Sequence, residues 1–267
     1  MEPTIEWERS VATLIVDGHP QSAVDVDDPT NVVFEYVRGF VLALTVLAPE
    51  GPLRVTHVGG AGMTLARWVQ ATRPGSPQIV LEPDAGLTEM VRRELPLSRG
   101  HRIRVRPQTG EIGLPALAAE SADVVVLDAY AAGRVPATLT SVEWFAEVAR
   151  VLAPGGLLLA NLADEPGLDW VGRVHASVQK SLGHTAFIAL HEVLKGKRYG
   201  NLVLVASRDT LDVDALRRAA VREPWPTGVL AAADLSRRVP GARPFVAATG
   251  DVAPSPEPPV ANAWRRR

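Results

Sequence analysis

The stretch VTHVGGAGMTLARWVQ, residues Val55 to Gln70, constrains the fold more than any other part of this sequence. A β-branched run leads into three glycines, Gly59, Gly60 and Gly62, and apolar residues then recur at helical spacing. Glycine lets the backbone turn tightly because no Cβ is in the way. The pattern therefore predicts a buried strand, a tight turn and a helix whose backbone amides face whatever lies over the turn. Ligand-binding loops have this pattern, and so does a simple strand-to-helix corner.

A second hydrophobic strand, QIVLEPD, follows at residues 78–84. Its end carries Glu82 and Pro83, about 20 residues beyond the glycine turn, where folds that bind dinucleotides and nucleosides place the acid that grips ribose hydroxyls. The spacing predicts that Glu82 contacts a ligand, and a solvated strand end is the alternative.

Composition narrows the class of protein. A chain of 267 residues, 46% hydrophobic and 22% charged, can bury the core of one large domain, alone or with a small appendage. The net charge of −2 gives no basic field for a phosphate backbone, so nucleic acid is not expected as a partner. The absence of cysteine excludes disulfides and thiolate catalysis and fits a reducing, cytoplasmic compartment.

No membrane association is expected. The N-terminus has no signal-peptide pattern. The most apolar stretch, residues 32–48, contains Glu35 and Arg38, and its uncharged part is too short to cross a bilayer. It is predicted to be a buried amphipathic helix. The six histidines are scattered without metal-ligand spacing, so no metal site is expected either.

Strands and helices alternate from residue 55 to 207. This order predicts an α/β fold with a doubly wound, Rossmann-like, seven-stranded, mostly parallel sheet whose last strand is antiparallel. The two last strands, 186–191 and 201–207, are expected to be joined without a helix. Two apolar runs around Asp17 and Gly18 predict a hairpin in a small β unit before this sheet.

The chain divides into four predicted segments. Residues 1–50 form the small N-terminal β hairpin unit and a connecting helix, and residues 51–208 form the Rossmann-like nucleoside-binding domain. A C-terminal helical appendage is expected over residues 209–250, including a short helix near its start. The tail 251–267 is too rich in proline to join the core and is expected to be flexible.

Capping residues predict where three helices begin. Asp84 is expected to cap the helix that follows the second strand. Thr140 and Glu143 have the spacing of a capping box, and Asp169 precedes an apolar helical stripe.

Ligands in an open α/β sheet bind beyond the carboxyl ends of the strands. The residues expected there are the glycine turn, Glu82, residues 108–110 and residues 128–130. Asp128 closes the apolar strand DVVVLD, and a carboxylate in that position can accept a proton from an amine or orient a cationic centre. The alternative is that Asp128 only caps a turn.

Six motifs occur in the order that they have in one known family. LIVDGHPQS resembles an N-terminal hairpin with the pattern DGxxQ, HVGGAGMTLAR resembles a loop IGGGDGGxxR, and VLEPD resembles VEIDxxV. VVVLDAY resembles a strand that ends in a catalytic DSSDP, the segment with LAPGG matches a helix and strand, and KRYGNLVLVAS resembles YPxGxWxFxxAS. Together these pieces, within residues 14–207, resemble the spermidine synthase (polyamine aminopropyltransferase) family, which has the class I S-adenosylmethionine-dependent methyltransferase-like fold.

The resemblance implies a co-substrate and site residues. The co-substrate is S-adenosylmethionine or its decarboxylated form, and no metal is implied. Asp128 matches the proton-accepting aspartate of the family, and Tyr130 of the same motif is taken as catalytic with it. The residues implied in binding the nucleoside lie in five segments: Gln21, Gly59, Gly60, Ala61, Gly62, Glu82, Pro83, Gln108, Thr109 and Asp128.

The chain departs from the family at acidic and aromatic positions. Gly62 replaces an aspartate that faces the aminopropyl ammonium, and the run 128–132 lacks the second aspartate of DSSDP. Asn31 falls near the place of the family's tyrosine, while Tyr36 lies five residues further on. Residues 107–111 lack the acid that meets the adenine amino group. Because a dicationic amine needs several carboxylates to replace its hydration, the acceptor is predicted to be less cationic than putrescine.

The leading hypothesis is a spermidine-synthase-like transferase, an aminopropyltransferase or a methyltransferase, with an unknown small-molecule acceptor of which an amine is one candidate. A genuine polyamine aminopropyltransferase and a non-catalytic nucleoside-binding or interaction module of the same fold are the alternatives. A homodimer is an open alternative to a monomer.

Overall fold

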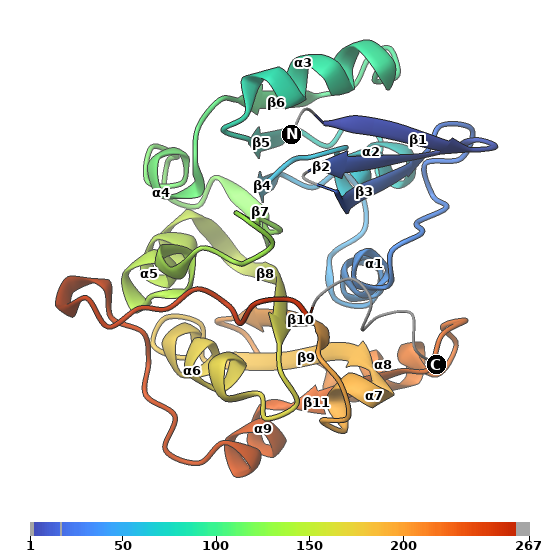
Figure 1. Ribbon diagram of the computed structural model, residues 1–267. Helices are drawn as coiled ribbons and strands as arrows, with labels where there is room; N and C mark the ends of the chain where they lie inside the picture. Colours follow the sequence, from blue (N-terminus) through green and yellow to red (C-terminus); the bar gives the residue numbers. More distant parts are fainter. Residues whose placement is uncertain (1–2, 17, 260–267) are drawn as a thin grey trace.

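The computed structural model describes residues 3–16 and 18–259, which form a small antiparallel sheet and a large sheet (Figure 1). Asp17, where the sequence predicts a hairpin turn, lies outside the described residues. The strands on either side of it do pair, with Val16 opposite His19. The small sheet has the order β1 (Thr4–Glu8), β2 (Val11–Val16), β3 (His19–Asp25).

The large sheet has eight strands. Four neighbouring pairs, from β6 across to β8, are parallel, and the remaining pairs are antiparallel. As predicted, the late strand β10 runs antiparallel, and it lies between β8 and β9. The order across the sheet is β11 (Thr227–Ala231), β9 (His184–Leu190), β10 (Gly200–Ser207), β8 (Leu152–Asp164), β7 (Ala122–Leu127), β4 (Val55–Val58), β5 (Gln78–Leu81), β6 (Ile103–Arg106).

The doubly wound α/β fold is confirmed, but the strand number predicted from sequence is wrong by one. Strand β11 comes from the segment that was expected to be helical, and it pairs with β9 at the sheet edge. It is short and mostly half-buried, and Gly228 lies within it, so its sequence has little of the alternation that marks a strand. Pairing with β9 stabilises it.

The connection between β9 and β10 also differs from the prediction. It contains one helical turn, α7 (His191–Leu194), where no helix was expected. Val193 and Leu194 are buried in this turn, so burial of two apolar side chains favours it. The turn is not a crossover helix, because β9 and β10 still pair directly, with Ile188 opposite Val203.

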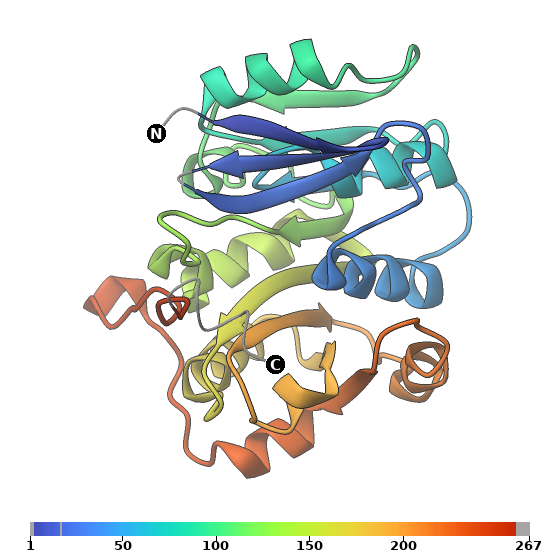
Figure 2. The same cartoon turned by 45° about the vertical axis from the view of Figure 1, so that its right-hand side comes forward.

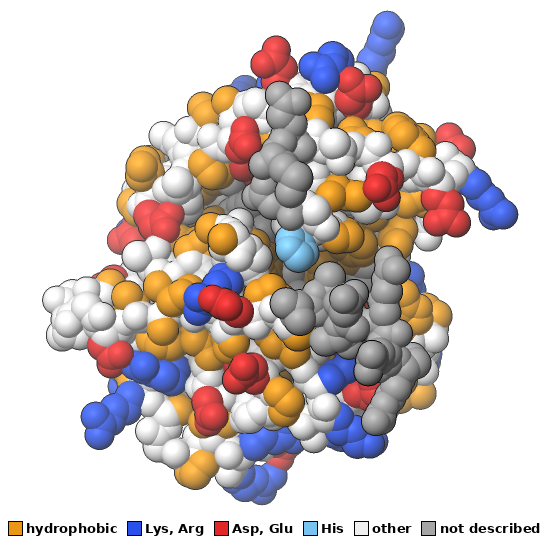
Figure 3. All heavy atoms as spheres, viewed as in Figure 1, with side chains coloured by type: hydrophobic (Ala, Val, Ile, Leu, Met, Phe, Trp, Pro, Cys, Tyr) orange, Lys and Arg blue, Asp and Glu red, His pale blue; other side chains and the backbone are white. Residues whose placement is uncertain are grey.

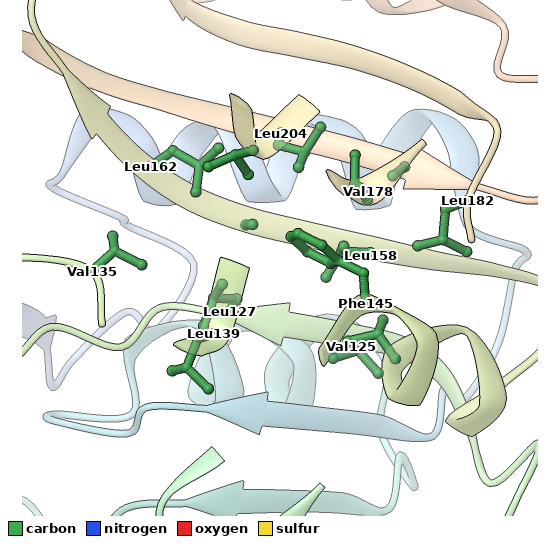
Figure 4. Close-up of a cluster of buried hydrophobic side chains, with 14 of the residues drawn as sticks. Val125, Leu127, Val135, Leu139, Phe145, Leu158, Leu162, Val178, Leu182 and Leu204 are labelled. Carbon is green, nitrogen blue, oxygen red and sulfur yellow. The ribbon is translucent and has the colours of Figure 1, made fainter. Parts of the chain in front are cut away.

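The alternating side chains of β7 divide the core between the two faces of the large sheet. Val125 and Leu127 pack with α5 and α6, while Val124 and Val126 pack with α1, α2 and α8. Figure 4 shows the first of these clusters. The helices are α1 (Glu35–Leu47), α2 (Thr64–Thr72), α3 (Ala85–Glu94), α4 (Gly110–Gly113), α5 (Val142–Val151), α6 (Asp169–Val178), α8 (Val213–Ala220), α9 (Ala232–Arg238) and the 3₁₀ turns η1 (Ala137–Thr140) and η2 (Ala247–Thr249).

The small sheet packs on one end of the large sheet. Leu14 and Val24 join a cluster with residues of α2, α3, β5 and β6, and both ribbon views show the small sheet beside α2 (Figures 1 and 2). The apolar stretch at residues 32–48 forms the buried helix α1, as predicted. Among the described residues, no helix has the length and apolar character needed to cross a membrane.

One of the three predicted helix caps is confirmed, and the other two are wrong. Asp84 accepts a hydrogen bond from the Leu87 amide and caps α3, and the short helix expected near residue 212 is α8. The cap of α5 is Ser141 instead of Thr140, because Thr140 ends the 3₁₀ turn η1. Helix α6 begins at Asp169, and its amides are capped by a residue outside the helix.

The C-terminal segment departs from its predicted packing. Although the tail was expected to stay off the core, Ser255 is fully buried, and its hydroxyl accepts a hydrogen bond from the Val135 amide at 3.0 Å. Residues 251–259 lie against the loop after β7 and against α6. The remaining tail, residues 260–267, lies outside the described residues.

The glycine turn after β4 is a steric requirement. Gly59 has φ +96°, and a Cβ there would lie 2.1 Å from the carbonyl oxygen of Asp128. A residue other than glycine would push β4 and β7 apart. Gly51 also has a positive φ of +88°, but nothing lies within 4 Å of the position of its missing Cβ.

These two glycines allow a matched test. Gly51→Ala is expected to cost roughly 1–2 kcal/mol of unfolding free energy, the usual penalty of a left-handed backbone. Gly59→Ala is expected to cost about 2–3 kcal/mol more, because the Asp128 carbonyl must also move. Urea unfolding of both variants measures the difference. Equal losses would contradict the close approach of the two strands.

Candidate functional site

The candidate site lies at the carboxyl ends of β4, β5, β7 and β8. Chain order moves outward from β4 through β5 to β6 and then resumes at β7 on the other side, so the β4–β7 boundary is a topological switch point. The Asp128 amide donates to the Val58 carbonyl at 2.8 Å, which fixes the end of β7 beside the glycine turn. The sheet therefore brings the predicted glycine turn and Asp128 together.

Glu82 lies at the end of β5 facing the glycine turn, as the sequence predicts. One carboxylate oxygen, Oε2, accepts hydrogen bonds from the Gly60 and Ala61 amides at 3.0 and 3.1 Å. The other, Oε1, accepts from the Asp84 amide at 3.0 Å, across Pro83. Glu82 thus stabilises the turn itself. Its predicted contact with ribose would use the carboxylate lone pairs that do not accept these three hydrogen bonds.

Strand β3 borders the other side of the turn. The Ser22 hydroxyl bonds to the Thr64 hydroxyl at 2.7 Å. A Cβ on Gly62 would lie 2.7 Å from Ser22 Oγ, so the hairpin occupies the space that an aspartate side chain would need. Gln21 precedes Ser22 on this strand and is half-buried.

Gln108 and Thr109 lie between β6 and α4. A Cβ on Gly110 would lie 2.5 Å from Val58, so this loop packs directly against the end of β4. Gln108 Oε1 is buried without a hydrogen-bond partner in the structure. A buried carbonyl oxygen without a donor is costly, which favours a ligand donor at this position. Glu111, in the first turn of α4, accepts a hydrogen bond from the Thr138 hydroxyl.

Asp128 lies in a shell of neutral hydrogen-bonding groups. Asn161, a polar residue within the apolar run of β8, donates through Nδ2 to Asp128 Oδ1 at 2.9 Å. This pair follows from the strand register, because Leu127 lies opposite Ala160. The hydroxyl of Tyr36, at the start of α1, donates a hydrogen bond to the same carboxylate.

A second layer of polar groups supports Asn161. Its Oδ1 accepts from Asn201 Nδ2 at 2.8 Å, and its backbone carbonyl accepts from the Tyr130 hydroxyl at 3.3 Å. Tyr199, immediately before β10, lies close enough for its charge to influence Tyr130. The chain has three tyrosines: Tyr36 and Tyr130 both interact with Asp128, and Tyr199 lies near Tyr130.

Burial dominates the electrostatics of this group. It raises the pKa of Asp128 to about 6, although the hydrogen bonds from Asn161 and Tyr36 favour the ionised form. Burial and the neighbouring Asp128 charge raise the pKa of Tyr36 and of Tyr130 well above the usual range. Asp128 is therefore the group that can change its protonation near neutral pH, with both phenols acting as neutral donors.

Several of these residues were not identified from the sequence as site residues. Asn161 is a lone polar residue within the apolar run 157–163 of β8, and that position was the available signal. Tyr36 lies five residues beyond the place where a tyrosine is expected, and only the packing of α1 brings it to Asp128. Asn201 and Tyr199 reach the site through the antiparallel strand β10.

Asp164 ends β8 but has a structural role. Its Oδ2 accepts from the Val171 amide at 2.7 Å and its Oδ1 from the Glu165 amide at 2.8 Å. It therefore caps α6, the helix that was expected to be capped by Asp169. Burial raises the pKa of Asp164 to about 6.

Within residues 3–16 and 18–259, no group of three or more histidine, cysteine or acidic side chains is arranged to hold a metal ion. Acidic and basic side chains are interspersed over the face shown in Figure 3. No single-sign field extends across the described part of that face.

Comparisons with known proteins establish the fold class of the chain. No protein-family model matches the sequence. Human methyltransferase-like protein 13, solved with SAH, shares the fold with a TM-score of 0.55 at 17% identity, over 79% of this chain and 95% of that chain. The chain therefore has the Rossmann-like methyltransferase fold that the sequence predicts.

Two further proteins show a similarity to one enzyme class within this fold. A probable spermidine synthase from Corynebacterium glutamicum ATCC 13032 is 26% identical with a TM-score of 0.82, covering 97% of this chain and 94% of that chain. A polyamine aminopropyltransferase from Chromobacterium violaceum is 22% identical over 225 residues, 82% of each protein. The chain is similar to spermidine synthases in both sequence and structure, which confirms the resemblance found in its motifs.

The buried carboxyl predicts a distinctive pH dependence. Because the pKa of Asp128 in the folded protein, about 6, exceeds its ordinary value of 3.8, the carboxyl favours folding while protonated and loses this contribution as pH rises through 6. Asp128→Asn is therefore expected to be more stable than the natural chain above pH 6, by roughly 1–3 kcal/mol, with no difference near pH 4. Urea unfolding across this pH range measures the effect.

Asp123 on the same strand is the control. Burial raises the pKa of Asp123, but hydrogen bonds from Arg54 outweigh it and lower the pKa overall. Asp123→Asn is expected to lower stability at neutral pH, with the loss shrinking in acid. A stability difference for Asp128→Asn that does not vary with pH would contradict the burial of its carboxyl.

Proposed function

We propose that this chain is a transferase that binds S-adenosylmethionine or its decarboxylated form and uses Asp128 as the base. The observation that carries the proposal is the Asp128 carboxyl, held in a neutral polar shell at the switch point beside the glycine turn. A base with a pKa near 6 accepts a proton effectively at neutral pH. The similarity to spermidine synthases and to methyltransferase-fold proteins supports a sulfonium nucleoside as the donor.

The sulfonium nucleoside would bind at the glycine turn and the residues next to it. Because the turn has glycines, no side chain covers its backbone. Glu82 offers carboxylate lone pairs, and Gln108 offers a buried side-chain carbonyl oxygen without a hydrogen-bond partner in the structure. These groups suit a nucleoside, which presents ribose hydroxyls and an adenine amino group as donors.

The reaction needs one substitution at carbon. The acceptor nitrogen forms a bond to a carbon next to the sulfonium, that carbon–sulfur bond breaks, and the sulfur leaves as a neutral thioether. The proton lost by the nitrogen goes to the Asp128 carboxylate. Asn161 and Tyr36 donate to this carboxylate in the described structure, so they orient it and stabilise its charge before the proton arrives.

The acceptor that fits is an amine less cationic than putrescine. Around Asp128, the described neighbours that contact it or Asn161 are tyrosines and asparagines, which carry no charge. One carboxylate can offset one ammonium, whereas a dication would leave a second charge without compensation.

The role of Glu82 can be tested by ligand titration. Glu82→Ala is expected to weaken methylthioadenosine binding by roughly 1–3 kcal/mol, about fivefold to 150-fold, because charged hydrogen bonds to the turn and to ribose are lost. Asp84→Ala is the matched control, since Asp84 lies two residues away and caps α3. Unchanged affinity in Glu82→Ala, measured calorimetrically, would refute the assignment.

The choice of donor is a separate expectation. Because Gly62 places no negative charge by the glycine turn, the natural chain is expected to bind S-adenosylmethionine and its decarboxylated form within tenfold of each other, a difference below about 1.4 kcal/mol. Side-by-side calorimetric titrations measure both affinities. A tenfold or greater preference for the decarboxylated form would show that Gly62 is not the determinant and would favour polyamine aminopropyl transfer.

A further inference from the structure

The segment Ala253–Glu257 is unusual in its hydrogen bonding. It reads Ala-Pro-Ser-Pro-Glu, and the prolines cannot donate a backbone hydrogen bond, so the segment cannot join a sheet ladder. Its carbonyls are left to accept from side chains. Three side chains from three different elements do so: Trp170 of α6 to Ala253 (2.9 Å), Arg134 of the loop after β7 to Ser255 (2.5 Å) and Tyr199 before β10 to Pro256 (3.4 Å).

Ser255 anchors the segment to the loop that follows Asp128. The Ser255 side chain is fully buried, its hydroxyl accepts from the Val135 amide at 3.0 Å, and its amide donates to the Val135 carbonyl at 3.2 Å. The Ala131↔Arg134 bridge closes this loop on itself. Figure 1 shows the segment running between α5 and α6 toward β10.

The segment also reaches the tyrosine group. Pro256 accepts from the Tyr199 hydroxyl, and Arg134, which is held by Ser255, is close enough to Tyr199 for its charge to act on the phenol. Tyr199 in turn influences Tyr130, whose hydroxyl supports Asn161. Hydrogen bonds, together with the electrostatic interaction between Tyr199 and Tyr130, therefore link the C-terminal segment to Asn161, the partner of Asp128.

We propose that Ala253–Glu257 is a positioning element of the candidate site, which holds the loop after Asp128 and the Tyr199 side chain in place. The hydrogen bonds of the segment go to Arg134, Val135, Trp170 and Tyr199, and none of these residues is Asp128 or part of the glycine turn. It acts through Val135, Arg134 and Tyr199. Only the description of the site as a transferase site rests on the proposed function, and the contacts do not.

Two truncations test the proposal without any ligand. One chain stops at Val252 and the control stops at Pro259, and phenolate absorbance is followed as the pH is raised. In the control, burial keeps the pKa of Tyr199 at about 12, so little phenolate is expected below pH 11. In the shorter chain one tyrosine is expected to titrate near pH 10, and adding Tyr199→Phe should remove that step. Identical titration curves for the two truncations would overturn the proposal.

Methylthioadenosine binding separates a local role from a general one. Both truncations are expected to bind it equally within twofold, since the segment's hydrogen bonds go to Arg134, Val135, Trp170 and Tyr199 and not to the glycine turn. Binding lost only in the shorter chain would overturn the proposal, because the segment would then support the whole edge of the sheet. If neither chain nor the full protein binds it, the proposed function fails while the tyrosine titration still decides the positioning role.

Point variants cover the case in which the shorter chain does not fold. Ser255→Ala removes the acceptor of the Val135 amide and is expected to speed hydrogen exchange at that amide at least tenfold and to shift the Tyr199 titration toward pH 10. Glu257→Gln is the control, because Glu257 is largely exposed and its contact to Arg134 spans 3.6 Å. Exchange and titration that remain unchanged in Ser255→Ala would refute the role of Ser255.

Discussion

The close approach of Gly59 to the backbone of Asp128 is the constraint on which the site depends. Strands β4 and β7 are parallel neighbours from which the chain continues in opposite directions, so their ends diverge unless a contact holds them together. Glycine permits that contact, and the Asp128–Val58 hydrogen bond fixes it. The turn that faces Glu82 and the carboxyl that faces Asn161 thereby become parts of one site.

Burial of Asp128 lowers the stability of the fold at neutral pH and raises the pKa of the carboxyl. Burying an ionisable carboxyl opposes folding at neutral pH, and two neutral donors, Asn161 and Tyr36, offset only part of the cost. The same burial moves the pKa to about 6, where the carboxyl can both accept and release a proton. Acidic neighbours would raise this pKa further and attract more cationic ligands, so the neutral shell bears on both the proposed base and the proposed acceptor.

The proline-rich segment shows why composition misjudges packing. Proline removes backbone donors, which argues against a place in a sheet, yet it leaves the carbonyls unchanged. Where side-chain donors such as Trp170 and Arg134 converge, a segment with few backbone donors can pack with its carbonyls satisfied. Here the donors come from elements far apart in the chain, and no local pattern reveals that they meet.

Local patterns determined the central part of this protein. Strand periodicity, the glycine turn and the cap at Asp84 are properties of neighbouring residues, so the sequence alone predicts the doubly wound sheet and the positions of Glu82 and Asp128 at strand ends. Tertiary structure decided the rest. The polar shell of Asp128, the cap of α6 and the edge strand β11 depend on which strands become neighbours and in which register. That register is set by packing between distant segments: β7 with β8, β8 with β10, and β9 with β11.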